Sequence, residues 1–289
     1  MTEADLPVSS NARTLPLPDA VDRDRKLWPY VIGLAGVHVL AAAAAVPWLF
    51  TWSGLALLLV GIPVFGQGIN FCYHRLLTHR ALVVPKWLER FWVVVAICNL
   101  EDTPARWVTV HRHHHNHSDD HEDPHSPLVN FLWSHFQWLT LHNHQTRTRA
   151  ALAHYARDIL ADRFYLTLEK RPLLAPAIYL AHLLLLFAAG AAVGGWSGGS
   201  AVEAARLWGY RNHETKDGSR NNALVGLLAA GEGWHNNHHH DPASACNQHR
   251  WWELDPTWYH IRLLQALGLA KKVILPRHRR HADRQSASS

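Results

Sequence analysis

Histidine is concentrated in three short segments of this chain, HRLLTH, HRHHH and HNNHH. Neutral imidazole is a good ligand for iron, copper, nickel and zinc. In the second and third segments the histidines are three and four residues apart, so a helix would present each set on one face. The first pair, five residues apart, fits a helix that unwinds slightly at its end. The eight candidate ligands are His74, His79, His111, His114, His115, His235, His238 and His239.

Eight imidazoles exceed what one metal ion binds, so this number of ligands predicts a centre of two ions. A histidine-rich metal-buffering tract is the alternative. Such tracts are low in complexity, whereas long segments separate these three sets. The sequence contains no HExxH motif, which disfavours zinc protease chemistry.

Carboxylates close to the histidine sets are candidates to accept the outer imidazole N–H groups of metal ligands. The candidates are Asp119, Asp123 and Glu232. Solvated acids beside basic loops are the alternative interpretation of all three. Isolated histidines such as His142, His213 and His260 are expected to be ordinary polar residues.

Apolar blocks alternate with polar, histidine-rich segments along the 289 residues, of which 48% are apolar. Three blocks are long enough for a hydrocarbon core of about 30 Å and predict membrane spans. They cover about 27–50, 55–72 and 173–193. The block at about 81–100 is interrupted by charged residues, which predicts a helix lying in the membrane interface.

The polar segments predict the parts outside the membrane. Residues 1–26 and 276–289 are expected to be disordered tails. A cytosolic helical cap is expected at 101–170 and 209–275, with helical patterns at 147–169 and 251–274. The predicted fold class is therefore all-α: an integral membrane helical domain over 27–275, with a histidine-rich site in its cap.

Charge and cysteine content limit the classes of protein to which this sequence can belong. The net charge of +5 and the grouping of basic residues beside apolar blocks favour an anionic membrane face over nucleic acid. Arg23, Arg25 and Lys26 precede the first span, so the positive-inside rule places the histidine sets on the cytoplasmic side. The three cysteines form no CxxC pair, and residues 1–20 contain no apolar core of a cleavable signal.

Three spans would put the third histidine set on the opposite side of the membrane from the first two. An even number of spans is needed if all three sets are to share metal ions. The segment Ser200–Arg211 would extend about 18 Å as a helix, well short of a crossing. The hydropathy pattern alone leaves this conflict open.

The sequence resembles the membrane fatty acid desaturases, and within them the acyl-CoA, stearoyl-CoA delta-9-like group. The resemblance covers most of residues 27–275. It rests on the specific motifs HRLLTHR at 74–80, EDTPARWVTVHRHHHNHSD at 101–119, DPHSP at 123–127, and GYRNHET with GEGWHNNHH between 209 and 239. The resemblance implies two iron ions held by the eight histidines, which use dioxygen and two electrons to place a cis double bond in a saturated acyl chain.

Further roles follow from the same resemblance. Trp107 is expected near the acyl tunnel, whereas His113, His117 and His240 occupy variable positions and are not expected to be ligands. The expected partners are a fatty acyl substrate, with acyl-CoA first, membrane lipid, and a separate electron donor such as ferredoxin or rubredoxin with its reductase. The expected location is the bacterial cytoplasmic membrane. Arginines beside the membrane, such as Arg75 and Arg80, are expected to bind a nucleotide phosphate or anionic lipid.

The sequence departs from the family pattern at one place. The family has a ninth histidine ligand, and an asparagine four residues earlier, at the end of a fourth span ahead of GYR. Alignment on GYR puts Arg206 and Val202 there, and an arginine cannot ligate iron because it stays protonated. A local deletion of roughly twenty residues, enough for one helix crossing, explains both this loss and the odd number of spans. A di-iron hydroxylase and a catalytically impaired desaturase are the alternative functions.

Overall fold

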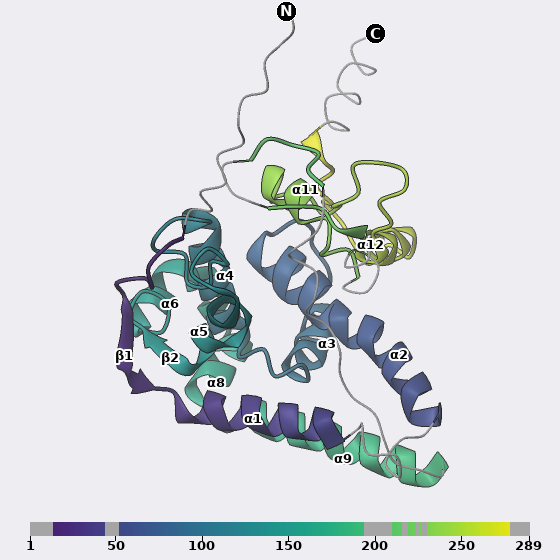
Figure 1. Cartoon of the computed structure of the whole chain (residues 1–289). Coiled ribbons are helices and arrows are strands. Elements are labelled where there is room, and N and C mark those ends of the chain that lie inside the picture. The colour runs from purple at the N-terminus through teal and green to yellow at the C-terminus, as the bar shows by residue number, and fades with distance from the viewer. Residues whose placement is uncertain are drawn as a thin grey trace, which may run out of the picture.

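The computed structural model describes residues 14–43, 52–193, 210–215, 219–223, 226 and 230–277. The prediction of a mostly helical protein is confirmed (Figure 1). The longer α-helices are α1 (Trp28–Ala43), α2 (Trp52–Gln67), α3 (Lys86–Ile97), α4 (Pro104–His117), α9 (Leu174–Val193) and α12 (Pro256–Ala266). The shorter ones are α5 (Trp138–Thr140), α6 (Arg149–Tyr155), α7 (Arg157–Leu160), α8 (Arg163–Lys170) and α11 (His235–His240). The described residues also contain two π-helices, η2 (Gly68–Thr78) and η3 (Trp133–Gln137).

The helices α1 and α9 lie within two of the segments predicted to span a membrane. The third helix, α2, overlaps the segment 55–72 but begins earlier, at Trp52, and is followed by η2 from Gly68. Among the described residues, none of the helices has the combination of length and apolar character that a membrane crossing requires. The segments next to these helices, 44–51 and 194–209, lie outside the described residues, and so does Arg206.

A small antiparallel sheet departs from the all-α expectation. Strand β1 (Val21–Lys26) pairs with β2 (Leu141–Asn143), with Val21 opposite Asn143. The segment 21–26 was expected to belong to a disordered tail, because its charged residues give no apolar alternation. Backbone pairing requires no apolar side chain, and it anchors this segment to the cap; residues 1–13 lie outside the described residues.

The helix α3 occupies the middle of the block at 81–100 and packs mainly against η2. It buries Leu88, Val93 and Ala96 in the core, whereas Trp87 and Phe91 are exposed. Gly68 permits the close approach of η2, since a Cβ there would lie 2.6 Å from the Ala96 backbone nitrogen. The two helices form the wall of the core beneath the histidine sets.

The two long helical patterns of the cap are divided into shorter elements. Residues 147–169 form α6, α7 and α8, because Thr148 and Asp162 accept backbone N–H groups and start new helices as N-caps. The pattern at 251–274 yields only α12, which begins after Asp255 and ends before Gly268 at φ +71°. Beyond Arg277 the chain lies outside the described residues.

Candidate metal centre

The first histidine pair belongs to η2, whose turns are wider than those of an α-helix: His74 lies within it and His79 is its C-cap residue. Such π-helical turns are rare and are frequent at functional sites. The His79 amide donates to the His74 carbonyl over 3.1 Å, and the two rings are 4.8 Å apart. The expected slight unwinding at the helix end is therefore a widening along all of η2, which brings residues five apart onto one face.

The second and third sets are carried by α4 and α11. Pro104 occupies the first turn of α4, where its missing N–H costs nothing. Within α4 the Nε2 atoms of His111 and His115 lie 3.1 Å apart, as expected for residues four apart on one helix face. The six-residue helix α11 contains the whole third set.

The eight predicted ligands converge in two groups. In each group one ring nitrogen per residue lies within 4.8 Å of the others. The first group is His74, His79, His111, His115 and His238, and the second is His114, His235 and His239. All eight predicted histidines belong to one group or the other, so the structure brings together every residue of the predicted ligand set.

The spacing of the nitrogens fits a metal ion. Two nitrogens that are each about 2.1 Å from one ion lie about 3.0 Å apart at a right angle and about 3.4 Å apart at a tetrahedral angle. The Nε2 atom of His238 is 3.1 Å from the Nε2 atoms of both His74 and His115. His238 Nε2 carries at most one proton, so it cannot donate a hydrogen bond to both of these nitrogens. The Nε2 atom of His79 is buried without a hydrogen-bond partner in the described part of the chain.

Four rings of the first group, those of His79, His111, His115 and His238, are neutral at physiological pH. Burial, followed by the neighbouring imidazoles, lowers the pKa of His79, His111 and His238 well below the usual value. The same causes lower the pKa of His115. At neutral pH these rings therefore carry a free lone pair, which a metal ion needs.

These lowered pKa values predict that the metal-free protein loses stability in mild acid. The unfolded chain takes up protons on histidine below about pH 6.5, whereas the buried rings do not. Each such ring then lowers the free energy of unfolding by about 1.4 kcal/mol for each pH unit below that value. We expect urea unfolding of the metal-free protein to show a midpoint that is flat above pH 7 and falls steeply toward pH 5. A midpoint that stays constant through that range would contradict the buried neutral state.

Two of the three predicted carboxylates contact the outer nitrogens of candidate ligands. Glu232 Oε2 lies 2.9 Å from His74 Nδ1, and Asp123 Oδ1 lies 2.9 Å from His114 Nδ1. Burial raises the pKa of Asp123, but the His114 contact outweighs it and lowers that pKa to about 2. Asp119 plays a different part, since its backbone N–H donates to Asp123. Contacts at Nδ1 leave Nε2 turned toward the centre.

Substitution of either carboxylate tests this arrangement. Glu232→Gln and Asp123→Asn keep the shape of the side chain but remove its charge. We expect each variant to bind iron about 10–100-fold more weakly, because the outer carboxylate orients the ring and raises its basicity. Competition with a chelator measures the affinity. Affinities equal to that of the unchanged protein would show that the two contacts only satisfy buried groups.

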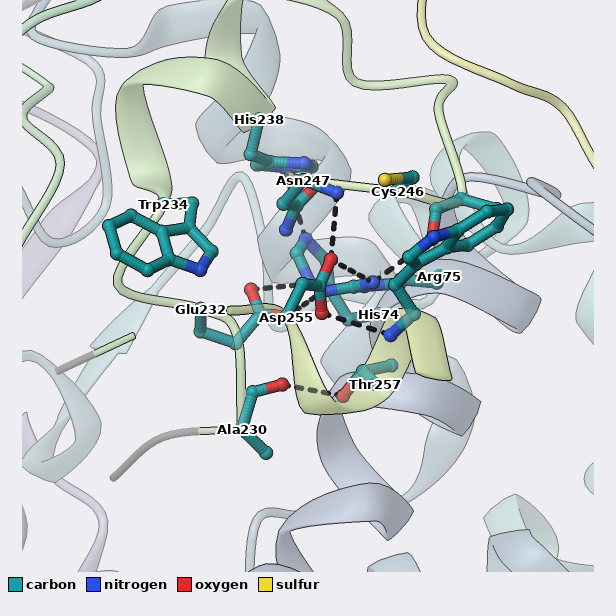
Figure 2. A network of polar contacts seen from close by, with 12 residues as sticks. His74, Arg75, Ala230, Glu232, Trp234, His238, Cys246, Asn247, Asp255 and Thr257 are labelled. Atoms are coloured by element: carbon teal, nitrogen blue, oxygen red, sulfur yellow. Dashed lines mark hydrogen bonds and ion pairs between the residues drawn. The ribbon is translucent and has the colours of Figure 1, made fainter. Parts of the chain in front are cut away.

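A buried ion pair beside the centre was not predicted. Figure 2 shows the Arg75 guanidinium against the Asp255 carboxylate, with N–O distances of 3.0 and 3.1 Å. Arg75 also donates to Glu232 over 3.3 Å and to the Ala245 carbonyl over 3.0 Å. The sequence suggested a surface arginine for phosphate or lipid, yet Arg75 is 1% exposed. Nothing in the sequence around Arg75 identifies a partner 180 residues away.

A network of amides connects the GYRNHET segment to α11. The Asn236 side-chain oxygen accepts from the Asn212 backbone N–H over 2.8 Å. The Asn237 side-chain NH2 donates to the Glu253 carboxylate over 2.8 Å. Glu253 is fully buried and also accepts from the Tyr210 hydroxyl over 2.6 Å. These contacts explain why asparagines stand between the histidines of α11: they fix the helix against the preceding segment.

Trp107 stacks on a candidate ligand. Its ring lies 4.7 Å from that of His111 at an angle of 23°. Its indole N–H donates to Glu101 over 3.1 Å. A cavity of about 720 Å³ is lined by His79, His115 and His239 of the centre. Trp107 does not line that cavity, so its expected place along an acyl tunnel stays a prediction.

The fold and site define a helical protein with a buried polyhistidine centre suited to metal ions, and comparison with known proteins gives its family. Residues 46–270 match the model of the fatty acid desaturase family. An sn-2 palmitoyl-lipid 9-desaturase of Nostoc sp. (strain 36) is 37% identical over 275 residues, which cover 89% of this chain and 93% of the relative. The chain therefore belongs to the fatty acid desaturase family.

Relatives of two substrate types are similar to this chain. An sn-1 stearoyl-lipid 9-desaturase of Synechocystis is 37% identical, covering 86% of this chain and 80% of the relative. An acyl-CoA 5-desaturase of Anemone leveillei is 36% identical, and the match covers 86% of this chain and 79% of the relative. The prediction of an oxidoreductase is confirmed. The family is generally membrane-associated and generally uses a di-iron centre.

Proposed function

We propose that this protein is an oxygen-dependent desaturase that places a cis double bond in a saturated acyl chain, at a delta-9-like position. The observation that carries the proposal is the convergence of eight imidazoles in groups of five and three. The reaction removes one hydrogen from each of two adjacent methylene groups. Dioxygen accepts these two hydrogens together with two electrons from a separate donor protein and two protons from water, and two water molecules are formed.

Two iron ions would be held by the two histidine groups and would supply the site where dioxygen is reduced. The residues around the histidine groups orient the imidazole rings and keep them neutral. Glu232 and Asp123 hold the rings of His74 and His114 in the ligating orientation. The packing around the first group lowers the pKa of His79, His111, His115 and His238, which keeps these four rings neutral.

We assign the protein to the bacterial cytoplasmic membrane, with the metal centre facing the cytoplasm. In support, α9 exposes Leu180, Leu184 and Leu185, and α1 exposes Ile32 and Val39. Helices with apolar side chains on their outer face require an apolar surrounding. Residues of α1, α2 and α9 would then belong to the spans, and α3 would lie in the interface.

We also propose that a segment is missing ahead of GYR, with Arg206 in place of a ninth ligand. The alignment with the Nostoc relative runs over 275 residues, although 89% of a 289-residue chain is fewer than that. The relative therefore has residues with no counterpart in this chain, as a deletion requires. Insertion of an apolar segment together with Arg206→His should raise activity. An unchanged rate would contradict a damaging deletion.

The first test of the function is the acyl composition of a host without its own desaturase, measured by gas chromatography with mass spectrometry. New cis-monounsaturated chains are expected, and their double-bond position gives the regiochemistry. Hydroxylated chains would instead identify a hydroxylase. An unchanged profile, with expression verified and a ferredoxin and its reductase supplied, would overturn the proposal. Purified protein given stearoyl-CoA or stearoyl phospholipid then identifies the acyl carrier.

A further inference from the structure

Large apolar side chains are exposed on α12 and on the segment before it. Trp251 is 83% exposed, Leu263 58% and Leu267 62%. Tyr259, Leu263 and Leu267 are four residues apart, so they share one face of the helix and its end. Large contiguous apolar areas are uncommon on water-exposed surfaces and mark sites of association.

The exposed charges of this region are all positive. They are Arg250, Arg262, Lys271 and Lys272, and none of them pairs with a carboxylate in the part of the chain that the structure describes. The only two carboxylates between residues 242 and 272, Glu253 and Asp255, are both fully buried. The surface therefore combines aromatic and aliphatic side chains with uncompensated cations.

The helix α12 is fixed at the end of α2. The Gln67 side chain donates to the Thr257 hydroxyl over 3.1 Å, and its oxygen lies 3.0 Å from His260 Nδ1. Gln67 is the last residue of α2, and Figure 1 shows α12 beside that end of α2. If α2 is a membrane span, as the proposed function holds, α12 lies at the level where the span leaves the bilayer.

The interfacial helix α3 lies on the same side of the molecule. The His260 ring of α12 is 5.1 Å from the Trp92 ring of α3. Backbone hydrogen bonds of 2.8 and 2.9 Å join Val83, just ahead of α3, to Lys271, just after α12. The two helices therefore form one continuous layer at one level of the protein.

We propose that this surface of α12 binds an anionic phospholipid bilayer. It consists of Trp251, Trp252, Tyr259, Leu263 and Leu267 with the four cations Arg250, Arg262, Lys271 and Lys272. Aromatic and aliphatic side chains enter the boundary between headgroups and acyl chains, while lysine and arginine bind lipid phosphates. An acidic partner protein would match the cations but would leave the exposed leucines without an apolar surrounding. The bilayer matches both features.

Spin labels test the proposal without need of iron or turnover. Leu263→Cys and Leu267→Cys, each with Cys98→Ser, place a nitroxide on this surface of the full chain in phosphatidylcholine nanodiscs containing phosphatidylglycerol. Gln145→Cys is the matched control, because Gln145 is exposed in the loop after β2. We expect the labels at 263 and 267 to be accessible to oxygen and several-fold less accessible to a water-soluble nickel chelate than the control. Equal chelate accessibility at all three positions would overturn the proposal.

The charge requirement is tested separately. Removal of phosphatidylglycerol should raise the chelate accessibility of the label at 263. Arg262→Gln, Lys271→Gln and Lys272→Gln combined should produce the same rise even when anionic lipid is present. A label that stays shielded in both experiments would overturn the anionic lipid as the ligand. Failure of desaturation with shielded labels would refute the proposed function and leave this surface intact.

Discussion

His114→Ala and His115→Ala should each abolish desaturation, but they should affect different ions. Both residues lie on α4, yet His115 belongs to the group of five and His114 to the group of three. Loss of one ligand from three leaves too few nitrogens to hold an ion, so His114→Ala should lower the iron content from about two to about one per chain. His115→Ala leaves four ligands in its group, so we expect weaker binding of that ion and a changed spectrum. Elemental analysis with Mössbauer spectroscopy measures both outcomes.

His117→Ala is the matched control on the same helix. His117 lies outside both groups, and its Nδ1 is 3.9 Å from the Asp120 carboxylate. Its iron content and its rate should equal those of the unchanged protein. Loss of iron in all three variants would show that any change in α4 disturbs the site, and the division into five and three would then be unsupported.

The histidine groups could be predicted because their information is local. Spacings of three and four residues specify one face of a helix, and α4 and α11 have that geometry. The number of imidazoles predicted two ions without any knowledge of the fold. The division into five and three could not be predicted, because it depends on how η2, α4 and α11 approach one another.

Two of the unpredicted features depend on contacts between distant residues, and a third depends on local helix caps. The pairing of β1 with β2 uses backbone groups, which leave no apolar pattern in VDRDRK. The division of residues 147–169 into three helices depends on caps at Thr148 and Asp162, which compete with the longer helical pattern. Arg75 looked like a surface residue because its burial comes from residues beyond position 230.

Arg75→Met should be among the most destabilising single changes in the cap. Arg75 is 1% exposed, and its partner Asp255 is fully buried. Removal of one member of such a pair leaves a buried charge and costs about 3–5 kcal/mol. At roughly 2–4 °C per kcal/mol, the apparent Tm should fall by about 10 °C. Thermal unfolding of the purified protein in detergent measures this change.

Arg80→Met is the matched control from the same HRLLTHR segment. The Arg80 guanidinium contacts Asp158 over 2.6 Å, but both side chains are more than 40% exposed, at 45% and 43%. Exposed pairs contribute only about 0–1 kcal/mol because water and salt screen them. A similar loss of Tm in Arg80→Met and Arg75→Met would show that burial is not the cause.

The order of the partner variants distinguishes a charge effect from lost packing. Asp255→Asn keeps one oxygen, which can accept the backbone N–H of either Trp258 or Asn247, since these two groups donate to different oxygens of Asp255. It also leaves Arg75 beside the Glu232 carboxylate at 3.3 Å. Asp255→Asn should therefore lower the Tm less than Arg75→Met, which leaves the Asp255 carboxylate without its cation. In the double variant Arg75→Met with Asp255→Asn no buried charge is stranded, so its Tm should exceed that of Arg75→Met alone. Additive losses would instead assign the effect to packing around η2 and α12.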